Sequence, residues 1–286
     1  MLLKELEQVV KENRHKHPLF VRSLLKEHIQ LYVLYIIYNA KNYKDSLVFM
    51  GGTCLRHFYG LPRLSEELDF EAINPVDTRE LAELLRTKIK NDLGFDDVRV
   101  SIHQRGKQIL LKFPVLRKLG LADASESDLL YVKIDINSEP VTEYAKIEYT
   151  LKSVGNKVFV AQHYDLPTLA AKKVAALLLR NRLKGPENRV TIKGRDYFDL
   201  IWFLEKNVKV NLKHLRALLN SPTLTLQELK EKIKANVNEM AGKPYFVSDL
   251  KADLLPFIED PNSVEIFAES FAKVFEGKVE RLEVAR

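Results

Sequence analysis

The stretch SLVFMGGTCLRHFYGLPRLSEELDFEA, residues 46–72, joins an apolar run, a glycine pair and a burst of carboxylates. The run SLVFM at 46–50 is short and ends in glycines, which is typical of a buried strand followed by a turn. Residues 53–59 can form a short helix, since the Gly-Leu-Pro sequence after them would stop it. A second strand then begins with LDFEA at 68–72. This order of elements predicts an α/β fold.

The carboxylates of this stretch fall on one face of the second predicted strand. Glu67 and Asp69 are two positions apart, so their side chains share a face while the apolar residues between them point to the other. Asp135 follows the same alternation in YVKIDIN at 131–137. A neighbouring strand can therefore add a third carboxylate to the pair.

Three carboxylates on adjacent strands suit two Mg²⁺ ions, because Mg²⁺ prefers oxygen ligands and leaves part of its shell to waters and phosphates. Two such ions can clamp the attacking and leaving oxygens of a phosphoryl displacement. The alternative is a solvated strand face, since acids two positions apart are common. The glycine pair before the helix favours the metal interpretation.

The segment from Gly51 and Gly52 to Thr53 lies between the predicted strand and the predicted helix. Backbone amides at such a turn, with the helix dipole, form an anion site. Thr53 either caps the helix or adds a hydroxyl group to a bound phosphate. Arg63 and Ser65 precede the acidic pair, and Arg63 is either a phosphate contact or an ordinary surface arginine. The predicted ligand is a nucleotide phosphate with its metal ions.

The composition is that of a soluble globular protein, with 46% hydrophobic and 29% charged residues in a chain of 286. The net charge of +6 permits a polyanionic partner but does not require one. Cys54 is the only cysteine, which excludes an intramolecular disulfide and a thiolate zinc cluster and favours a cytoplasmic location. The apolar stretch at 29–40 is too short to span a bilayer, so no membrane partner is expected.

The hydrophobic period changes near residue 160. Before it, helices are expected at 1–14, 18–43, 53–59 and 78–93, and strands at 46–50, 68–72, 98–103, 108–115, 129–137, 147–151 and 157–161. After it, the spacing is helical at 166–184, 195–205, 211–219, 225–237 and 263–277. We predict an α/β domain with N-terminal helices at 1–160 and a mostly helical domain at 161–286.

GGTCLRHFYGLPRLSEELDF at 51–70 resembles the signature of the AbiEii-type nucleotidyltransferases, the toxins of type IV toxin–antitoxin systems in the DNA-polymerase-β-like superfamily. That family has Gly-Gly-Thr, a short helix, Tyr-Gly-x-x-Arg-x-Ser, and Asp-x-Asp followed by Phe. The matching residues are Gly51, Gly52, Thr53, Tyr59, Gly60, Arg63, Ser65, Asp69 and Phe70. Weaker matches follow in the expected order in DLPTLAAKKVAALLLR at 165–180 and KGRDYFDLIWFL at 193–204.

The resemblance implies a nucleotidyltransferase core with a mixed sheet, NTP as substrate and Mg²⁺ as cofactor, with Mn²⁺ as a substitute. The implied metal ligands are Glu67, Asp69 and Asp135, which are also implied to be catalytic together with Lys173 and Asp196. The implied nucleotide-binding residues are Gly51, Gly52, Thr53, Arg63, Ser65 and Lys173. The family usually has aspartate in place of Glu67, whose extra methylene shifts the ligating oxygens and could weaken metal binding or activity.

Two charged residues of the helical half lie on apolar stripes. Lys173 shares a helix face with Leu169 and Leu177, so it either snorkels to the surface or finds a partner. The resemblance implies that it reaches the triphosphate as a point charge. Asp196 either pairs with Lys173 or Arg180 or supports the active site. The sequence does not separate these alternatives.

The segment RNRLKGPENRVTIKGR at 180–195 is dense in positive charge and lies between the two helices that carry these residues. It is either a solvated charge run or a surface that neutralises an RNA backbone.

The leading hypothesis is Mg²⁺-dependent transfer of NMP to an acceptor hydroxyl, activated by metal and by Asp135 as a base, with release of pyrophosphate. The tRNA 3′ end is the favoured acceptor, and a cognate antitoxin is expected. One alternative is a catalytically weakened nucleotide- or RNA-binding module. Another is nucleotidyl transfer to a protein or a small molecule.

Overall fold

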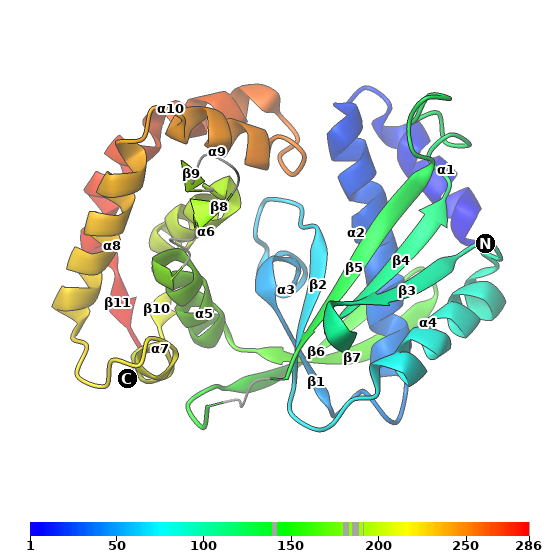
Figure 1. Cartoon of the computed structure of the whole chain (residues 1–286), viewed down its shortest axis with the longest axis horizontal. Coiled ribbons are helices and arrows are strands. Elements are labelled where there is room, and N and C mark those ends of the chain that lie inside the picture. The colour runs from blue at the N-terminus through cyan, green and yellow to red at the C-terminus, as the bar shows by residue number, and fades with distance from the viewer. Residues whose placement is uncertain (139–141, 180–182, 185–188, 191, 286) are drawn as a thin grey trace. The chain divides into compact units, whose positions relative to one another are not determined.

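The computed structural model describes residues 1–138, 142–179, 183–184, 189–190 and 192–285. The chain forms two compact units, the first from residues 1–141 and 147–164 and the second from residues 142–146 and 165–286. The first unit combines helices with a large sheet, and the second is mostly helical (Figure 1). The predicted fold class, an α/β core with a mixed sheet followed by a mostly helical region, is confirmed.

A seven-stranded mixed sheet forms the centre of the first unit, in the order β3-β4-β5-β2-β1-β7-β6. Its strands are β1 (Leu47–Met50), β2 (Glu67–Ala72), β3 (Arg99–His103), β4 (Gln108–Pro114), β5 (Leu129–Asn137), β6 (Ile147–Val154) and β7 (Lys157–Tyr164). β2 pairs in parallel with β5, and β1 pairs in parallel with β7. The β2–β5 pairing sets the two acidic segments of the sequence side by side.

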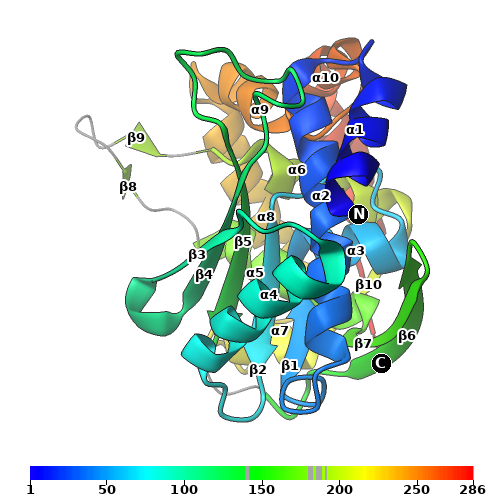
Figure 2. The same ribbon diagram turned by 90° about the vertical axis from the view of Figure 1, so that its right-hand side faces the viewer.

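Helices cover the apolar face of this sheet. The helical elements of the first unit are α1 (Leu2–Asn13), α2 (Pro18–Tyr38), α3 (Gly51–Tyr59), α4 (Thr78–Leu93) and the 3-10 turn η1 (Gln104–Gly106). α2 contacts β5, β6 and β7 and lies beside α4 (Figure 2). Along β5, buried Val132, Ile134 and Ile136 alternate with half-buried residues. One face of the strand therefore joins the core, and the other is left for polar side chains.

Several predicted helices have different ends. α2 ends at Tyr38 rather than at residue 43, because the backbone N–H of Asn39 closes its last turn. α3 starts at Gly51 rather than at residue 53, so both glycines belong to its first turn. α5 is described as far as Leu179, residues 180–182 lie outside the described residues, and Leu183–Lys184 forms a short strand, β8, where the sequence predicted helix.

The second unit packs its helices around an aromatic centre. Its helical elements are α5 (Leu166–Leu179), α6 (Gly194–Glu205), α7 (Leu212–Leu218), α8 (Leu226–Ala241), α9 (Phe246–Leu254), α10 (Pro261–Lys278) and the 3-10 turn η2 (Val279–Arg281). The short strands β8, β9 (Arg189–Val190), β10 (Lys209–Val210) and β11 (Glu283–Val284) accompany them. The rings of Tyr197, Phe246 and Phe271 lie 5.3 to 5.7 Å apart between centroids, which joins α6, α9 and α10. α9 was not predicted, although its buried residues Phe246, Leu250 and Leu254 follow at four-residue steps, because it has only nine residues.

Candidate active site

The glycine pair ends strand β1 and opens helix α3. Gly51 has a φ of +79°, a conformation that favours glycine. A Cβ atom at Gly51 would lie 2.0 Å from the carboxylate oxygen Oδ2 of Asp69, since Met50 and Asp69 are partners in the β1–β2 register. The missing side chain therefore makes room for Asp69. This close approach is the physical link between the glycines and the carboxylates that follow them in the sequence.

Gly52 makes room for a second pair of side chains. A Cβ atom there would lie 2.9 Å from a guanidinium nitrogen of Arg63 and 2.9 Å from the hydroxyl oxygen of Ser65. Both side chains are buried, and Arg63 donates a hydrogen bond to the Leu64 carbonyl at 2.9 Å. The surface alternative for Arg63 is wrong, because the residue is only 2% exposed. Contact of Arg63 or Ser65 with a nucleotide stays a prediction.

Thr53 is buried in the first turn of α3. Its hydroxyl group donates a hydrogen bond to the backbone carbonyl of Glu67. Met50 is the N-cap of α3, so the capping alternative for Thr53 is wrong. The Thr53–Glu67 hydrogen bond ties the start of the helix to the start of β2, and it holds the glycine turn next to the strand that carries the acids.

The three predicted carboxylates converge on one face of the sheet. In the parallel β2–β5 register, Asp69 is the partner of Asp135 and Glu67 is the partner of Lys133. One carboxylate oxygen from each of Glu67, Asp69 and Asp135 lies within 4.8 Å of the others. All three residues are half-buried, so the cluster stays open to solvent on one side. The sequence alternation identified this set because burial alternates along β5 and along the first four residues of β2.

Two polar neighbours of the cluster were not predicted. The Lys133 ammonium lies 3.0 Å from a carboxylate oxygen of Glu67. The Gln108 side-chain amide, on the neighbouring strand β4, donates to Asp135 at 2.8 Å. The sequence alone could have placed Lys133 near the cluster, because it stands two positions before Asp135 and shares its strand face. Gln108 could only be found once the β4–β5 register was known.

The carboxyl group of Asp135 holds its proton more tightly than usual. Its pKa is raised to about 6, first by burial and then by its hydrogen bond to Glu67, while the Gln108 hydrogen bond and the Lys133 charge oppose this rise. Three carboxylates that gather on one sheet face and stay partly exposed offer a set of oxygen ligands. Such a set suits Mg²⁺, whose charge would favour the ionised form of Asp135. The residues fit the predicted metal.

The predicted lysine and aspartate of the second unit form a cluster within that unit. The Lys173 ammonium on α5 lies 2.7 Å from Asp199 and 3.7 Å from Asp196, both on α6. Asp199 is fully buried and Asp196 nearly so. The Lys173–Asp196 ion pair offered as one alternative is present, whereas Arg180 lies outside the described residues. Catalytic roles for Lys173 and Asp196 stay predictions.

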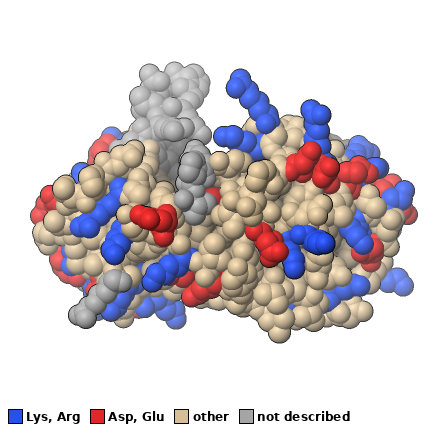
Figure 3. Space-filling model, turned by 90° about the horizontal axis from the view of Figure 1, so that it is seen from below, with Lys and Arg blue, Asp and Glu red and all other residues tan. Residues whose placement is uncertain are grey.

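The predicted basic surface at 180–195 falls largely outside the described residues. Arg195, at its end, is engaged within the second unit. Its side chain pairs with Asp253 at 3.2 Å and lies over the Phe257 ring at 4.5 Å. On the molecular face in Figure 3, basic and acidic side chains occur in small mixed groups. RNA binding by this segment therefore stays a prediction.

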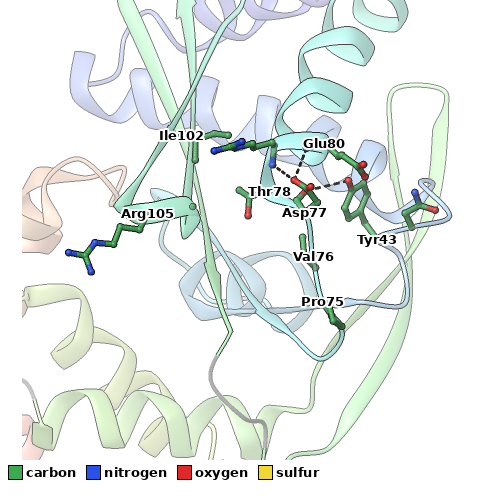
Figure 4. Close-up of a pocket in the computed structure, with 11 residues that line it drawn as sticks. Tyr43, Pro75, Val76, Asp77, Thr78, Glu80, Ile102 and Arg105 are labelled. Carbon is green, nitrogen blue, oxygen red and sulfur yellow. Dashed lines mark hydrogen bonds between the residues drawn. The ribbon is translucent and has the colours of Figure 1, made fainter.

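The first unit also has a pocket of about 1030 Å³, and none of the predicted site residues lines it (Figure 4). It lies beside the start of α4, which would attract an anion. However, the Asp77 carboxylate already accepts hydrogen bonds from the backbone amides of Arg79 and Glu80 at 2.8 and 3.1 Å. This helix terminus is occupied by the protein's own anion, so the carboxylate cluster remains the candidate active site.

A mixed sheet with a glycine turn beside three carboxylates is the arrangement expected of a nucleotidyltransferase. Residues 32–276 match the family model described as nucleotidyl transferase AbiEii toxin of type IV toxin–antitoxin systems. The chain belongs to this family and is a nucleotidyltransferase-family enzyme. The resemblance inferred from residues 51–70 is confirmed.

A solved structure shares the fold, and a second one matches at a lower score. MenT4, a nucleotidyltransferase toxin from Mycobacterium tuberculosis, matches with a TM-score of 0.54 and 16% identity over 95% of this chain and 89% of that one. JHP933 from Helicobacter pylori matches with a TM-score of 0.43 and 16% identity over 90% of this chain and 95% of that one. A search of curated proteins found no significant match. Among the described residues, no helix is both long and apolar enough to cross a membrane.

Proposed function

We propose that this toxin-family enzyme transfers NMP from an NTP–Mg²⁺ complex to an RNA hydroxyl, with the tRNA 3′ end as the favoured acceptor. The observation that carries the proposal is the convergence of Glu67, Asp69 and Asp135 within 4.8 Å beside the glycine turn. Three half-buried carboxylates that converge in this way form a site for divalent cations and for the phosphates that such cations bring.

In this proposal each part of the first unit has one task. Glu67, Asp69 and Asp135 hold the cation, which when bound neutralises phosphate charge and acidifies a bound hydroxyl. The backbone amides of Gly51 and Gly52, at the N-terminus of α3, bind a phosphate oxygen. Asp135, which accepts a hydrogen bond from Gln108 at the cluster, is the proposed acceptor of the proton from the attacking hydroxyl. Family resemblance adds Lys173 as a contact to the triphosphate.

The direct test is transfer of label from each α-³²P-NTP into total RNA and into total protein in the presence of Mg²⁺. We expect label in RNA with the wild type and none with Asp69→Ala. Asp96→Asn is the matched control, because its side chain is 76% exposed and lies outside the cluster. Label in protein but not in RNA would show that the acceptor is a protein. Equal labelling by the wild type and Asp69→Ala would overturn the proposal.

Toxicity is tested separately. We expect expression to arrest growth, and Asp69→Ala to remove the arrest although the protein accumulates to the same level. Equal arrest by both versions would show that toxicity does not depend on the carboxylate cluster. Co-expression with the neighbouring gene product then tests for a cognate antitoxin.

One observation favours a second candidate, a binding module with weakened catalysis. Glu67 stands where the family has aspartate, and one of its oxygens is already paired with Lys133 at 3.0 Å. If this pair competes with the cation, the wild type transfers no label and Glu67→Asp restores transfer. Retained binding of RNA without labelling by either protein would support the binding module.

A further inference from the structure

The large sheet ends in an unusually open edge strand. β6 is the last strand of the order, and in the described part of the chain no strand pairs with its outer edge. It has eight residues and pairs with β7 without interruption from Ile147 opposite Tyr164 to Val154 opposite Lys157. It contains neither proline nor a bulge, two of the devices that protect an edge from pairing with another strand, although it carries the charged residues Glu148 and Lys152.

An apolar surface lies along this edge. Tyr149 and Leu151 on β6 are each 66% exposed, and Val158 and Val160 on β7 are 55% and 50% exposed. These four side chains share one face, since Leu151 is the register partner of Val160 and the other two follow at two-residue steps. Four large apolar side chains grouped in this way are typical of an interaction surface.

The sequence of β6 is complementary to itself. If two copies pair antiparallel about Thr150, Glu148 of each lies opposite Lys152 of the other, and Tyr149 lies opposite Leu151. The first pairing joins opposite charges, and the second joins an aromatic ring to an aliphatic side chain. Both kinds of cross-strand pair stabilise a sheet.

The other edge strand, β3, lacks the charge complementarity of β6. Paired with itself about Ser101, it would place Arg99 opposite His103, a pair without opposite charges. β3 is also shorter, with five residues. The complementarity is therefore particular to β6 and is not a general feature of the edges of this sheet.

We propose that β6 pairs antiparallel with β6 of a second copy, centred on Thr150, and joins the two large sheets into one. A second copy of β6 is inferred as the partner strand from the opposite charges at positions 148 and 152 and from the apolar pair between them. The proposal concerns the β6 edge alone and does not depend on the reaction that the carboxylate cluster carries out.

The test is sedimentation equilibrium of the full chain from about 1 µM to about 100 µM. We expect a dimer whose dissociation constant rises about tenfold with Glu148→Lys or with Lys152→Glu, because each change converts two attractive cross-strand pairs into repulsive ones. The double variant exchanges the charges and should return the constant to near the wild-type value. Three results would each overturn this pairing. The wild type could be a monomer at all concentrations, the single variants could leave the dissociation constant unchanged, or the double variant could fail to restore it.

A second pair of variants controls for damage to the fold, since Glu148 also accepts a hydrogen bond from Tyr59. Leu151→Lys introduces a charge on the open face of β6 and should weaken the dimer. Val158→Lys introduces the same charge on the same face but on β7, away from the proposed pairing partner, and should leave the dimer intact. Circular dichroism confirms that both variants are folded. Equal effects of the two variants would contradict the register.

Discussion

Each unit holds a cluster of carboxylates with one lysine, but the two clusters differ in burial. In the second unit, the Lys173 ammonium lies close to Asp196 and Asp199, and both aspartates are buried. In the first unit, Lys133 is paired with Glu67, and the three acids are half-exposed. The aspartates of the second unit are therefore shielded from solvent, whereas the acids of the first unit are accessible to a cation from outside.

The comparison shows that a carboxylate's surroundings, more than its position in a sequence motif, indicate its task. A buried ion pair is costly to break but does not by itself bind a substrate. A half-open cluster in which Asp135 has a raised pKa is a typical functional site. Variants of the acids in the first cluster should therefore affect mainly activity, whereas a variant of the fully buried Asp199 should affect mainly stability.

The largest effect is expected from Asp135→Asn. The change keeps the size of the side chain but removes a ligand and the proposed proton acceptor, so nucleotidyl transfer should fall about 1,000-fold. The melting temperature should not fall, because the change also removes repulsion between clustered acids. Label transfer and thermal unfolding measure the two quantities. A large loss of stability with little loss of transfer would reverse the roles assigned to the two clusters.

The next effect is expected from Asp199→Ala. Asp199 is fully buried and lies 2.7 Å from the Lys173 ammonium, so its removal leaves a charge without its closest partner. We expect the free energy of unfolding to fall by about 3 kcal/mol, the low end of the range for breaking a buried pair, because Lys173 is partly exposed. Urea denaturation measures it, with the exposed Asp96→Asn as control. A change no larger than that of the control would contradict a structural role.

The carboxylate cluster could be predicted because it depends on local rules. Alternation along two predicted strands identified Glu67, Asp69 and Asp135, and the family resemblance implied the same three residues as metal ligands. The burial of Arg63 could not be predicted, since it depends on the space that Gly52 leaves for the guanidinium group. Long-range packing also decides the partners of Lys173, for which the sequence offered only alternatives.

A smaller effect is expected from Gly51→Ala, which tests the contact between the glycine turn and the acids. The new methyl group would overlap the Asp69 carboxylate, and the backbone at φ +79° is unfavourable for alanine. We expect a loss of about 2 kcal/mol of stability from the strained backbone together with a marked loss of transfer as Asp69 moves away. Gly60→Ala is the matched control, because Gly60 also has positive φ but has no atom within 4 Å of a Cβ position. Equal loss of transfer in both variants would show that backbone strain alone is responsible.

The smallest effect concerns the pH dependence of the first cluster. Because the pKa of Asp135 is raised to about 6 in the folded protein and is near 4 in an unfolded chain, the folded state binds more protons between these values. The Asp135 contribution to stability of the metal-free protein should therefore decrease as the pH rises from about 4 to about 6. Glu67→Gln removes the neighbouring negative charge and should lower the pKa of Asp135, which NMR of the side-chain carboxyl carbons can follow. The same variant should raise stability at neutral pH without Mg²⁺. An unchanged pKa would show that burial alone holds the proton, and the cluster would then lack the repulsion that distinguishes it from the buried pair of the second unit.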